Sequence, residues 1–341
     1  MQNYGTDQNV LLRAVEWLEQ GHEVILVTVL KTWGSSPRPP GSLMVMSRDG
    51  VVDGSVSGGC VEDDMLQRYV KHQLSDSYPT RVDYGVNRDD ATRFGLPCGG
   101  RLELLIEQLQ SDSIKQLVSL LDAMQQHKLM ARNVDLQTGQ VSLETASAEQ
   151  DFVCTNTNVS KVFGPQWNML LIGACHLSQY VSQMALMLGY RVIVCDPREE
   201  YARKWQVEGT ELTSIMPDDA VIKYAQQPRS IVLALTHDPK LDDMALLDAL
   251  QSPAFYVGAI GSQRNCDSRR QRLKGLGISG IQLQRLHAPV GLAIGSHTPP
   301  EIAVSILAEI TQQRNVPAHI NFPTQSNLAS QAEKSPLVAR E

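Results

Sequence analysis

The chain has 341 residues, of which 42% are hydrophobic and 20% charged, and a net charge of −7 at pH 7. This length predicts two domains, each with its own core. A negative charge, with no block of lysines and arginines outside one predicted helix, argues against a nucleic acid or a membrane surface as partner. Because no segment reaches the ~18 apolar residues of a membrane span and residues 1–8 lack a signal-peptide pattern, we expect a cytoplasmic protein.

Residues 1–108 are predicted to form a β-rich α+β domain. Hydrophobic periodicity indicates helices at 10–20 and 61–74, and strands at 22–33, 42–47, 51–56 and 102–107. Residues 109–165 are expected to be a connecting segment, with a helix at 111–127 followed by a polar stretch rich in β-formers.

Residues 166–312 alternate strand and helix patterns, which predicts a Rossmann-like domain with a mostly parallel sheet. The expected strands are 169–172, 191–195, 230–235 and 254–259, and the expected helices are 176–188, 241–250, 264–275 and 299–312. Residues 313–341 are polar, contain three prolines and have little periodicity. We therefore expect a disordered tail. The fold class is α/β overall.

Two of the six cysteines lie beside glycine pairs, in Ser57-Gly58-Gly59-Cys60 and in Cys98-Gly99-Gly100. No CxxC pair is present, so we interpret all six as reduced thiols. If a helix begins near Cys60, its N-terminus favours a phosphate or a thiolate there. The alternative is a turn whose cysteine is a small buried hydrophobe. A second such box, together with Ser36 and Arg38 in a proline-rich loop, favours a functional site.

A nucleotide-binding pattern opens the second domain. Gly173 follows a strand, His176 begins a helix, and Asp196 ends the next strand about twenty residues later, as in a dinucleotide fingerprint. However, Cys175 and Ser178 stand where that fingerprint has its second and third glycines. A Rossmann domain without a dinucleotide in the usual pose is therefore at least as good an interpretation.

Polar residues follow the later strands of this domain and are expected at the edge where open parallel sheets bind ligands. They are His237, Asp238, Gly261, Ser262, Arg264, Arg285 and His287. Taken singly, Asp238 fits a helix N-cap and His287 a half-buried, hydrogen-bonded ring. Taken together they favour a site. No histidine spacing of a zinc site is present.

Several of these motifs, in this order, resemble the xanthine dehydrogenase accessory protein family, XdhC/CoxI. The matching segments are 34–38, 54–62, 98–100, 236–238, 258–262, 285–291 and 298–303. The chain departs from the family pattern at Cys175, where the family has glycine, and at Gln263. These departures bear on a phosphate contact in the second domain.

The resemblance implies a chaperone, more than an enzyme, that binds the molybdenum cofactor as molybdopterin or its dinucleotide form. It implies that the protein supports cofactor sulfuration and inserts the cofactor into the apoenzyme of a molybdenum hydroxylase. Cysteine desulfurase, cofactor-synthesis proteins and a second copy of the chain are the further partners it implies. All the motif residues named above become candidate cofactor contacts, with Cys60 and Cys98 as candidate molybdenum or sulfur contacts.

Two other classes of function stay open at this point. An NAD(P)-dependent oxidoreductase would use the second domain, with His237 as the general acid. A sulfur-transfer or redox protein would depend on the cysteines alone.

Overall fold

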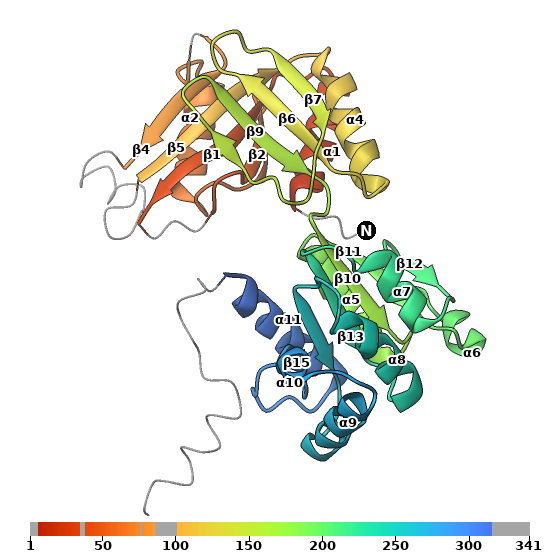
Figure 1. The fold of residues 1–341 in the computed structure, drawn as a ribbon. Coiled ribbons are helices and arrows are strands. Elements are labelled where there is room, and N and C mark those ends of the chain that lie inside the picture. The colour runs from red at the N-terminus through yellow and green to blue at the C-terminus, as the bar shows by residue number, and fades with distance from the viewer. Residues whose placement is uncertain (1–5, 35–37, 76, 86–100, 316–341) are drawn as a thin grey trace, which may run out of the picture. The chain divides into compact units, whose positions relative to one another are not determined.

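The computed structural model describes residues 6–34, 38–75, 77–85 and 101–315, which form two compact units (Figure 1). The first unit comprises Met1–Trp167 with Leu186–Arg191, and the second comprises Asn168–Ala185 with Val192–Glu341. Residues 109–165, expected as a connecting segment, are thus part of the first unit.

The first unit is built on a five-stranded antiparallel sheet in the order β3-β2-β1-β5-β4. Its strands are β1 (Val24–Trp33), β2 (Leu43–Ser47), β3 (Val52–Gly54), β4 (Thr80–Tyr84) and β5 (Arg101–Leu109). Side chains alternate between the two faces of β1. Ile25 and Val27 pack against α2 (Cys60–Val70), whereas Val24 and Leu26 pack with α1 (Thr6–Glu19) and α4 (Ser113–Gln125).

A second antiparallel sheet, in the order β7-β6-β9-β8, belongs to the same unit. Its strands are β6 (Met130–Asp135), β7 (Val141–Thr145), β8 (Val153–Cys154) and β9 (Asn158–Phe163). Val134 and Val159 share a small core with Leu30 and Leu105 of the first sheet. A buried ion pair adds to this contact, because Arg132 of β6 donates two hydrogen bonds, of 3.0 and 2.8 Å, to Glu107 of β5.

The second unit is the predicted Rossmann-like domain (Figure 1). Its six-stranded sheet has the order β12-β11-β10-β13-β14-β15, which is the Rossmann order 3-2-1-4-5-6. The strands are β10 (Trp167–Ile172), β11 (Tyr190–Cys195), β12 (Glu211–Thr213), β13 (Ser230–Ala234), β14 (Tyr256–Ala259) and β15 (Leu286–His287). The helices are α5 (His176–Met187), α6 (Glu199–Ala202), α7 (Pro217–Tyr224), α8 (Pro239–Ala249), α9 (Gln263–Gly275), α10 (Gly280–Gln284) and α11 (Pro299–Asn315).

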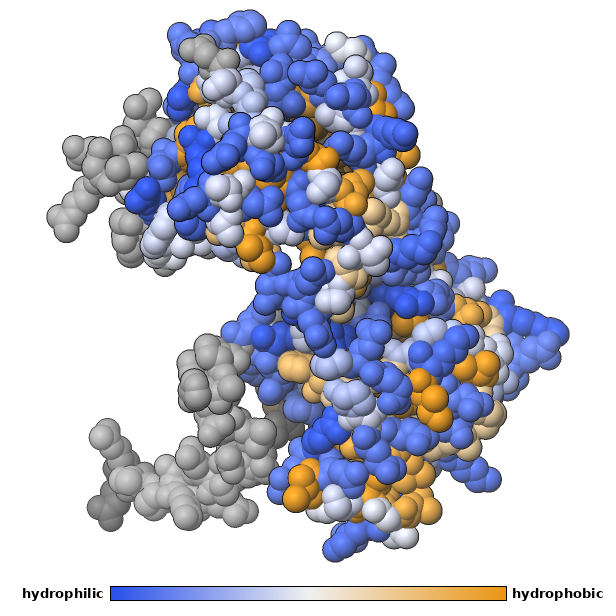
Figure 2. All heavy atoms as spheres, turned by 45° about the horizontal axis from the view of Figure 1, so that its top comes forward, coloured by the Kyte–Doolittle hydropathy of each residue, from blue (hydrophilic) through white to orange (hydrophobic). Residues whose placement is uncertain are grey.

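Polar residues cover most of the visible face of each unit, and the apolar patches are more extensive on the second unit (Figure 2). Scattered exposed apolar side chains are normal on folded domains and by themselves mark no site. In the described ranges, no helix combines the length and the apolar character that crossing a membrane requires.

The buried Glu107–Arg132 pair gives a stability prediction. Arg132→Leu leaves the Glu107 carboxylate buried without its partner, and we expect a loss of about 3–5 kcal/mol in the free energy of unfolding. The control is Arg13→Leu, which breaks an exposed pair with Glu16 (2.6 Å) and should cost less than about 1 kcal/mol. Urea unfolding measures both changes, and equal losses would contradict the prediction.

Candidate functional site

Three connections of the first unit leave its five-stranded sheet at the same end. This end, here called the loop end, is marked by Trp33 paired with Arg101, by Gly54 at the end of β3, and by Tyr84 at the end of β4. The strand order therefore brings the described residues that adjoin these strand ends, Gly34, residues 38–42 and residues 55–59, to the same end of the sheet. Arg38, Ser57, Gly58 and Gly59 belong to these connections, and Cys60 follows one of them directly as the first residue of α2.

Residues 55–59 are organised around the carboxylate of Glu62, which is 8% exposed. The backbone N–H groups of residues 56–59 donate to it over 2.9, 2.7, 2.9 and 2.9 Å in chain order. The hydroxyl of Ser55 donates over 2.8 Å, and the hydroxyl of Ser57 forms a very short hydrogen bond to the same group. Burial raises the pKa of Glu62, but the donors, led by Ser57, outweigh burial and hold the pKa far below 4.5.

Of the two groups that the helix N-terminus was expected to favour, a phosphate does not find free amides at Gly58 and Gly59. Both amides are already used by Glu62, the third residue of α2, which closes a capping arrangement with Gly59. Gly58 and Gly59 have φ angles of 95° and 155°, a region that glycine reaches without strain. The hydrogen bonds to Glu62 therefore fix the turn, and with it the position of Cys60, the residue that follows.

Cys60 is the residue that follows the turn. It begins α2, as the sequence predicted, and its side chain is exposed. The buried-hydrophobe alternative is thus excluded for Cys60. The thiol stands at a helix N-terminus, directly after the backbone amides that donate to Glu62.

Other candidates of the first unit lie at the same end or outside the described residues. Arg38 is exposed. The guanidinium of Arg101 lies 4.9 Å from the centre of the Trp33 ring and pairs with Asp83 at 3.0 Å. Ser36, Cys98, Gly99 and Gly100 lie outside the described residues.

In the second unit, most of the predicted residues do meet at the carboxyl edge of the sheet. Gly173 follows β10, Asp196 follows β11, His237 follows β13, and Gly261 follows β14. The residues that begin or cap the following helices complete this edge: His176, Asp238, Ser262 and Arg264. His176 and Arg264 are exposed there.

Asp196 does not have the environment of a ribose-binding carboxylate. It is 0% exposed, and Arg198 donates to both of its oxygens, over 2.9 and 2.8 Å. The backbone N–H of Ala174, in the glycine turn, donates to Asp196 over 2.8 Å. Burial raises the pKa of Asp196, but Arg198 and Ala174 outweigh it and the pKa is lowered. The carboxylate therefore stays charged and fully engaged.

The glycine turn itself departs from the turn that holds a pyrophosphate in the dinucleotide fingerprint. Gly173 has a φ of 111°, and a Cβ there would lie 2.9 Å from the Thr236 side chain, so only glycine fits. Cys175 fills the position of the second glycine, and its Sγ lies 3.2 Å from the Ser178 hydroxyl and 3.4 Å from the Leu235 carbonyl. The residues present do not fit NAD(P) in the usual pose.

The two loops after β13 and β14 are tied together beneath this edge. Asp242, which is fully buried, accepts from the Thr236 hydroxyl at 2.7 Å and from Arg269 at 2.8 Å. Arg269 also donates to the Ile260 carbonyl at 2.8 Å. His237 is exposed with a positive φ of 61°, an unusual conformation for a non-glycine residue. Asp238 accepts from the Lys240 amide at the start of α8, which confirms its interpretation as a helix N-cap.

His287 ends β15, at the carboxyl end of that strand, whereas Arg285 is placed differently. Arg285 precedes β15, and its guanidinium donates to the carbonyls of Leu250, Ser252 and Ala254 before β14. The expectation that Arg285 lies at the carboxyl edge is thus wrong. Its hydrogen bonds join the start of β15 to the residues before β14, which lie at the opposite edge of the sheet. His287 has its ring stacked on Tyr256 and its Nδ1 2.7 Å from Glu309, which agrees with a half-buried, hydrogen-bonded ring.

Within the described ranges, no three His, Cys, Asp or Glu side chains gather in a way that could hold a metal ion. Sequence reasoning missed the role of Glu62. Its signal was present, because a glutamate three residues after a helix cap is the capping-box pattern. Sequence reasoning also missed Arg198, whose position two residues after Asp196 gave no comparable signal.

The class of this protein is defined by its two units. An antiparallel α+β unit with an exposed thiol precedes a Rossmann unit with an altered nucleotide-binding pattern. Comparison with known protein families agrees with this class. The XdhC Rossmann domain family matches residues 169–310, and the XdhC and CoxI family matches residues 17–85. The chain belongs to the XdhC/CoxI family, as the sequence motifs predicted.

Similar proteins cover nearly the whole chain. The molybdenum cofactor insertion chaperone PaoD of Escherichia coli is 29% identical over 90% of this chain and 89% of its own. A probable xanthine dehydrogenase subunit of Bacillus subtilis is 25% identical over 87% of this chain and 95% of its own. The crystal structure of a xanthine dehydrogenase from Bacillus halodurans has the same fold, with a TM-score of 0.70, 23% identity, and coverage of 92% of this chain and 98% of that one.

The environment of Glu62 predicts a pH dependence. Because the folded-state pKa of Glu62 is lowered, its contribution is complete above pH 4.5 and is lost as the pH falls toward the lowered value. Glu62→Gln should reduce the free energy of unfolding at pH 7 by at least about 2 kcal/mol, since a neutral amide replaces a charged acceptor. The difference from the unmodified protein should narrow below pH 4.5.

Urea unfolding at pH 7 and at successively lower pH values measures this difference. Asp63→Asn, at an exposed neighbour in the same turn, is the control and should change stability by less than about 1 kcal/mol. A Glu62→Gln effect that does not vary with pH would contradict the assignment.

The altered nucleotide pattern predicts no tight binding of a dinucleotide. Titration with NADH, followed by its fluorescence, should give no saturation below about 1 mM, which corresponds to roughly −4 kcal/mol of binding free energy. The reason is that Asp196 and the Ala174 amide are bound to each other and Cys175 fills the turn. Micromolar, saturable binding would contradict this account of the second unit.

Proposed function

We propose that this protein is a molybdenum cofactor chaperone that binds the cofactor, supports its sulfuration and inserts it into a xanthine dehydrogenase-type molybdenum hydroxylase. The observation that carries the proposal is the exposed Cys60 thiol at the loop end, presented by a turn that Glu62 fixes. Family membership and the similarity to a molybdenum cofactor insertion chaperone support it.

The chemistry of the cargo suits the loop end. The cofactor presents a metal with soft sulfur ligands and an anionic phosphate, and thiolates are soft ligands. Cys60 is the contact that we assign to the metal or its sulfur, with Cys98 as its partner from the segment before β5. Arg38 is assigned to the phosphate, because Gly58 and Gly59 are occupied by Glu62. Ser57, Gly58 and Gly59 act by positioning Cys60.

The second unit has a supporting role in this proposal. Its carboxyl edge presents His176, His237 and Arg264 to solvent, and these side chains are polar contacts for the cofactor or for the recipient enzyme. We further propose that the protein works in the cytoplasm as a homodimer, receives cofactor from the synthesis proteins, and meets a cysteine desulfurase as sulfur source.

The test measures copurified cofactor. The full chain is produced together with the cofactor-synthesis proteins, purified without oxygen, denatured, and assayed for the fluorescence of the oxidised pterin. The amount of molybdopterin that the double variant Cys60→Ala/Cys98→Ala retains should fall at least about tenfold. This is the change expected when a soft ligand that contributes about 1.4 kcal/mol of binding free energy is lost.

Cys154→Ala is the matched control, since Cys154 is a partly buried cysteine on β8 of the same unit. It should retain the cofactor fully. Unchanged occupancy in the double variant would exclude the two thiols as determinants of binding. If denaturation releases no pterin from any variant but Cys60 accepts sulfur, the assignment as a cofactor chaperone is replaced by an assignment as a sulfur-transfer protein.

A further inference from the structure

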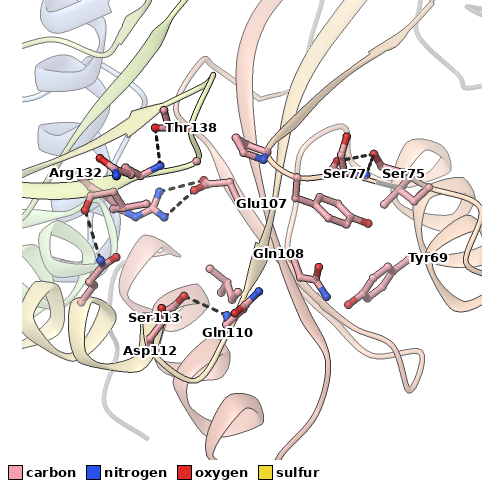
Figure 3. Close-up of a pocket in the computed structure, with 18 of the residues that line it drawn as sticks. Tyr69, Ser75, Ser77, Glu107, Gln108, Gln110, Asp112, Ser113, Arg132 and Thr138 are labelled. Carbon is pink, nitrogen blue, oxygen red and sulfur yellow. Dashed lines mark hydrogen bonds and ion pairs between the residues drawn. The ribbon is translucent and has the colours of Figure 1, made fainter.

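A cavity of about 790 Å³ lies in the first unit, at the end of the five-stranded sheet opposite to the loop end. It is found where β1 begins and β5 ends. Figure 3 shows Gln108 and Gln110 near the end of β5, with Thr138 of the turn between β6 and β7 on one side and Ser77 on the other. None of the candidate site residues that the structure describes lines this cavity.

The end of β5 has an open edge along the cavity. β4 begins at Thr80, which pairs with Ile106, so the residues of β5 after Ile106 pair with β1 but not with β4. Pro79 precedes β4 and, like other prolines, has no N–H with which to extend the ladder. The row of the sheet that β4 occupies is therefore vacant opposite Gln108.

The direction of the Gln108 backbone groups follows from the neighbouring strand. In an antiparallel ladder each residue directs its N–H and its C=O to the same side, and successive residues alternate between the two sides. Val29 of β1 bonds with residues 41 and 42, on the side of β2. Ile25, four residues earlier, has the same direction, so its pair Gln108 directs both groups away from β1 and toward the open edge. Gln108 is exposed, and among the described residues neither group has a hydrogen-bond partner.

The carboxylates and guanidinium groups of the lining are paired, with one exception. Arg132 is buried in its ion pair with Glu107. Arg48 pairs with Glu23 at 2.6 Å. Asp112 precedes α4 and is exposed, and within the described ranges its carboxylate neither caps the helix nor forms an ion pair. The cavity therefore combines an open strand edge with one unneutralised negative charge.

The remaining walls suit alternating side chains. Leu74, Tyr78 and Pro79 supply apolar surface. The turn between β6 and β7 forms the wall beside the end of β4, since a Cβ at Gly139 would lie 2.9 Å from the ring of Pro79. When an extended peptide adds to a sheet edge, its main chain supplies the hydrogen bonds and its alternate side chains occupy such walls.

We propose that this cavity binds an extended segment of another protein by strand addition at Gln108, and that the segment carries a lysine or arginine that pairs with Asp112. The peptide residue opposite Gln108 supplies the acceptor and the donor that this position lacks. The segment occupies the row of the sheet that β4 leaves vacant. This interaction goes beyond the proposed function, since it lies at the other end of the sheet from Cys60 and takes a protein segment instead of the cofactor.

The experiment uses the full chain and a panel of blocked heptapeptides of valine and threonine, in which one lysine occupies each position in turn. Calorimetry measures binding, and hydrogen exchange followed by mass spectrometry reports on the segment that contains Gln108. We expect saturable binding of at least one peptide at one site per chain, with slower exchange in that segment. N-methylation of the peptide residue that pairs with Gln108 should weaken binding about three- to tenfold, the loss that one neutral hydrogen bond gives.

Asp112→Lys tests the charge. It should weaken binding of the lysine peptide and strengthen binding of the matched glutamate peptide, each about two- to fivefold, as for an exposed ion pair. Asp122→Lys is the matched control, because Asp122 is an exposed aspartate of α4 outside the cavity lining and its substitution changes the net charge equally. It should leave both affinities unchanged.

Three results would overturn the proposal. They are the absence of saturable binding below about 1 mM for every peptide of the panel, equal affinities in all variants, and a dimer of the chain that itself slows exchange at Gln108. The last result would assign the open edge to a second copy. Each of them is separate from failure of the proposed function, which is measured on copurified molybdopterin in the cysteine variants.

Discussion

The structure of the loop end depends on one carboxylate held by backbone amides. Four consecutive N–H groups and two serine hydroxyls converge on Glu62. A turn of small residues such as Ser57-Gly58-Gly59 would otherwise sample many conformations, because glycine loses more backbone freedom on ordering than any other residue. Charged acceptors form hydrogen bonds roughly twice as strong as neutral ones, and this offsets that entropy. The chain thus supplies an anion of its own to these amides, and Cys60 remains exposed directly after the turn.

In the Rossmann unit, too, a carboxylate of the chain itself binds a backbone amide of the turn that would otherwise face a ligand. Asp196 stands at the end of the second strand of the sheet, where a dinucleotide-binding protein presents a carboxylate to ribose, but it is bound by Arg198 and by the Ala174 amide of the glycine turn. The interactions that would hold a cofactor are used within the chain to hold the turn instead. In the same unit, Asp242 and Arg269 join the loops that carry His237 and Gly261. Fold by itself therefore does not decide function, and the side chains of the site must be considered.

Elements with clear periodicity were predictable from the sequence. The alternation of strand and helix gave the parallel sheet, and α2 begins at Cys60 as expected. Short elements were not predicted: β15 has two residues and α6 has four, too few for any period to appear. The ion pair of Asp196 with Arg198 and the position of Arg285 were missed for another reason. They depend on which side chains the tertiary fold brings together, and residues at equal distances from strand ends look alike in sequence although they lie at opposite edges of the sheet.

Helix α2 connects the loop end of the first unit with the opposite end of its sheet. It begins with Cys60 at the loop end and reaches Tyr69 nine residues later, about 14 Å along a helix axis. Its buried face, including Val61, Met65 and Tyr69, packs on the sheet, so the helix is held along its length. The position of the exposed Cys60 thiol is therefore set by the packing of α2 on the sheet as well as by the turn that Glu62 holds before it.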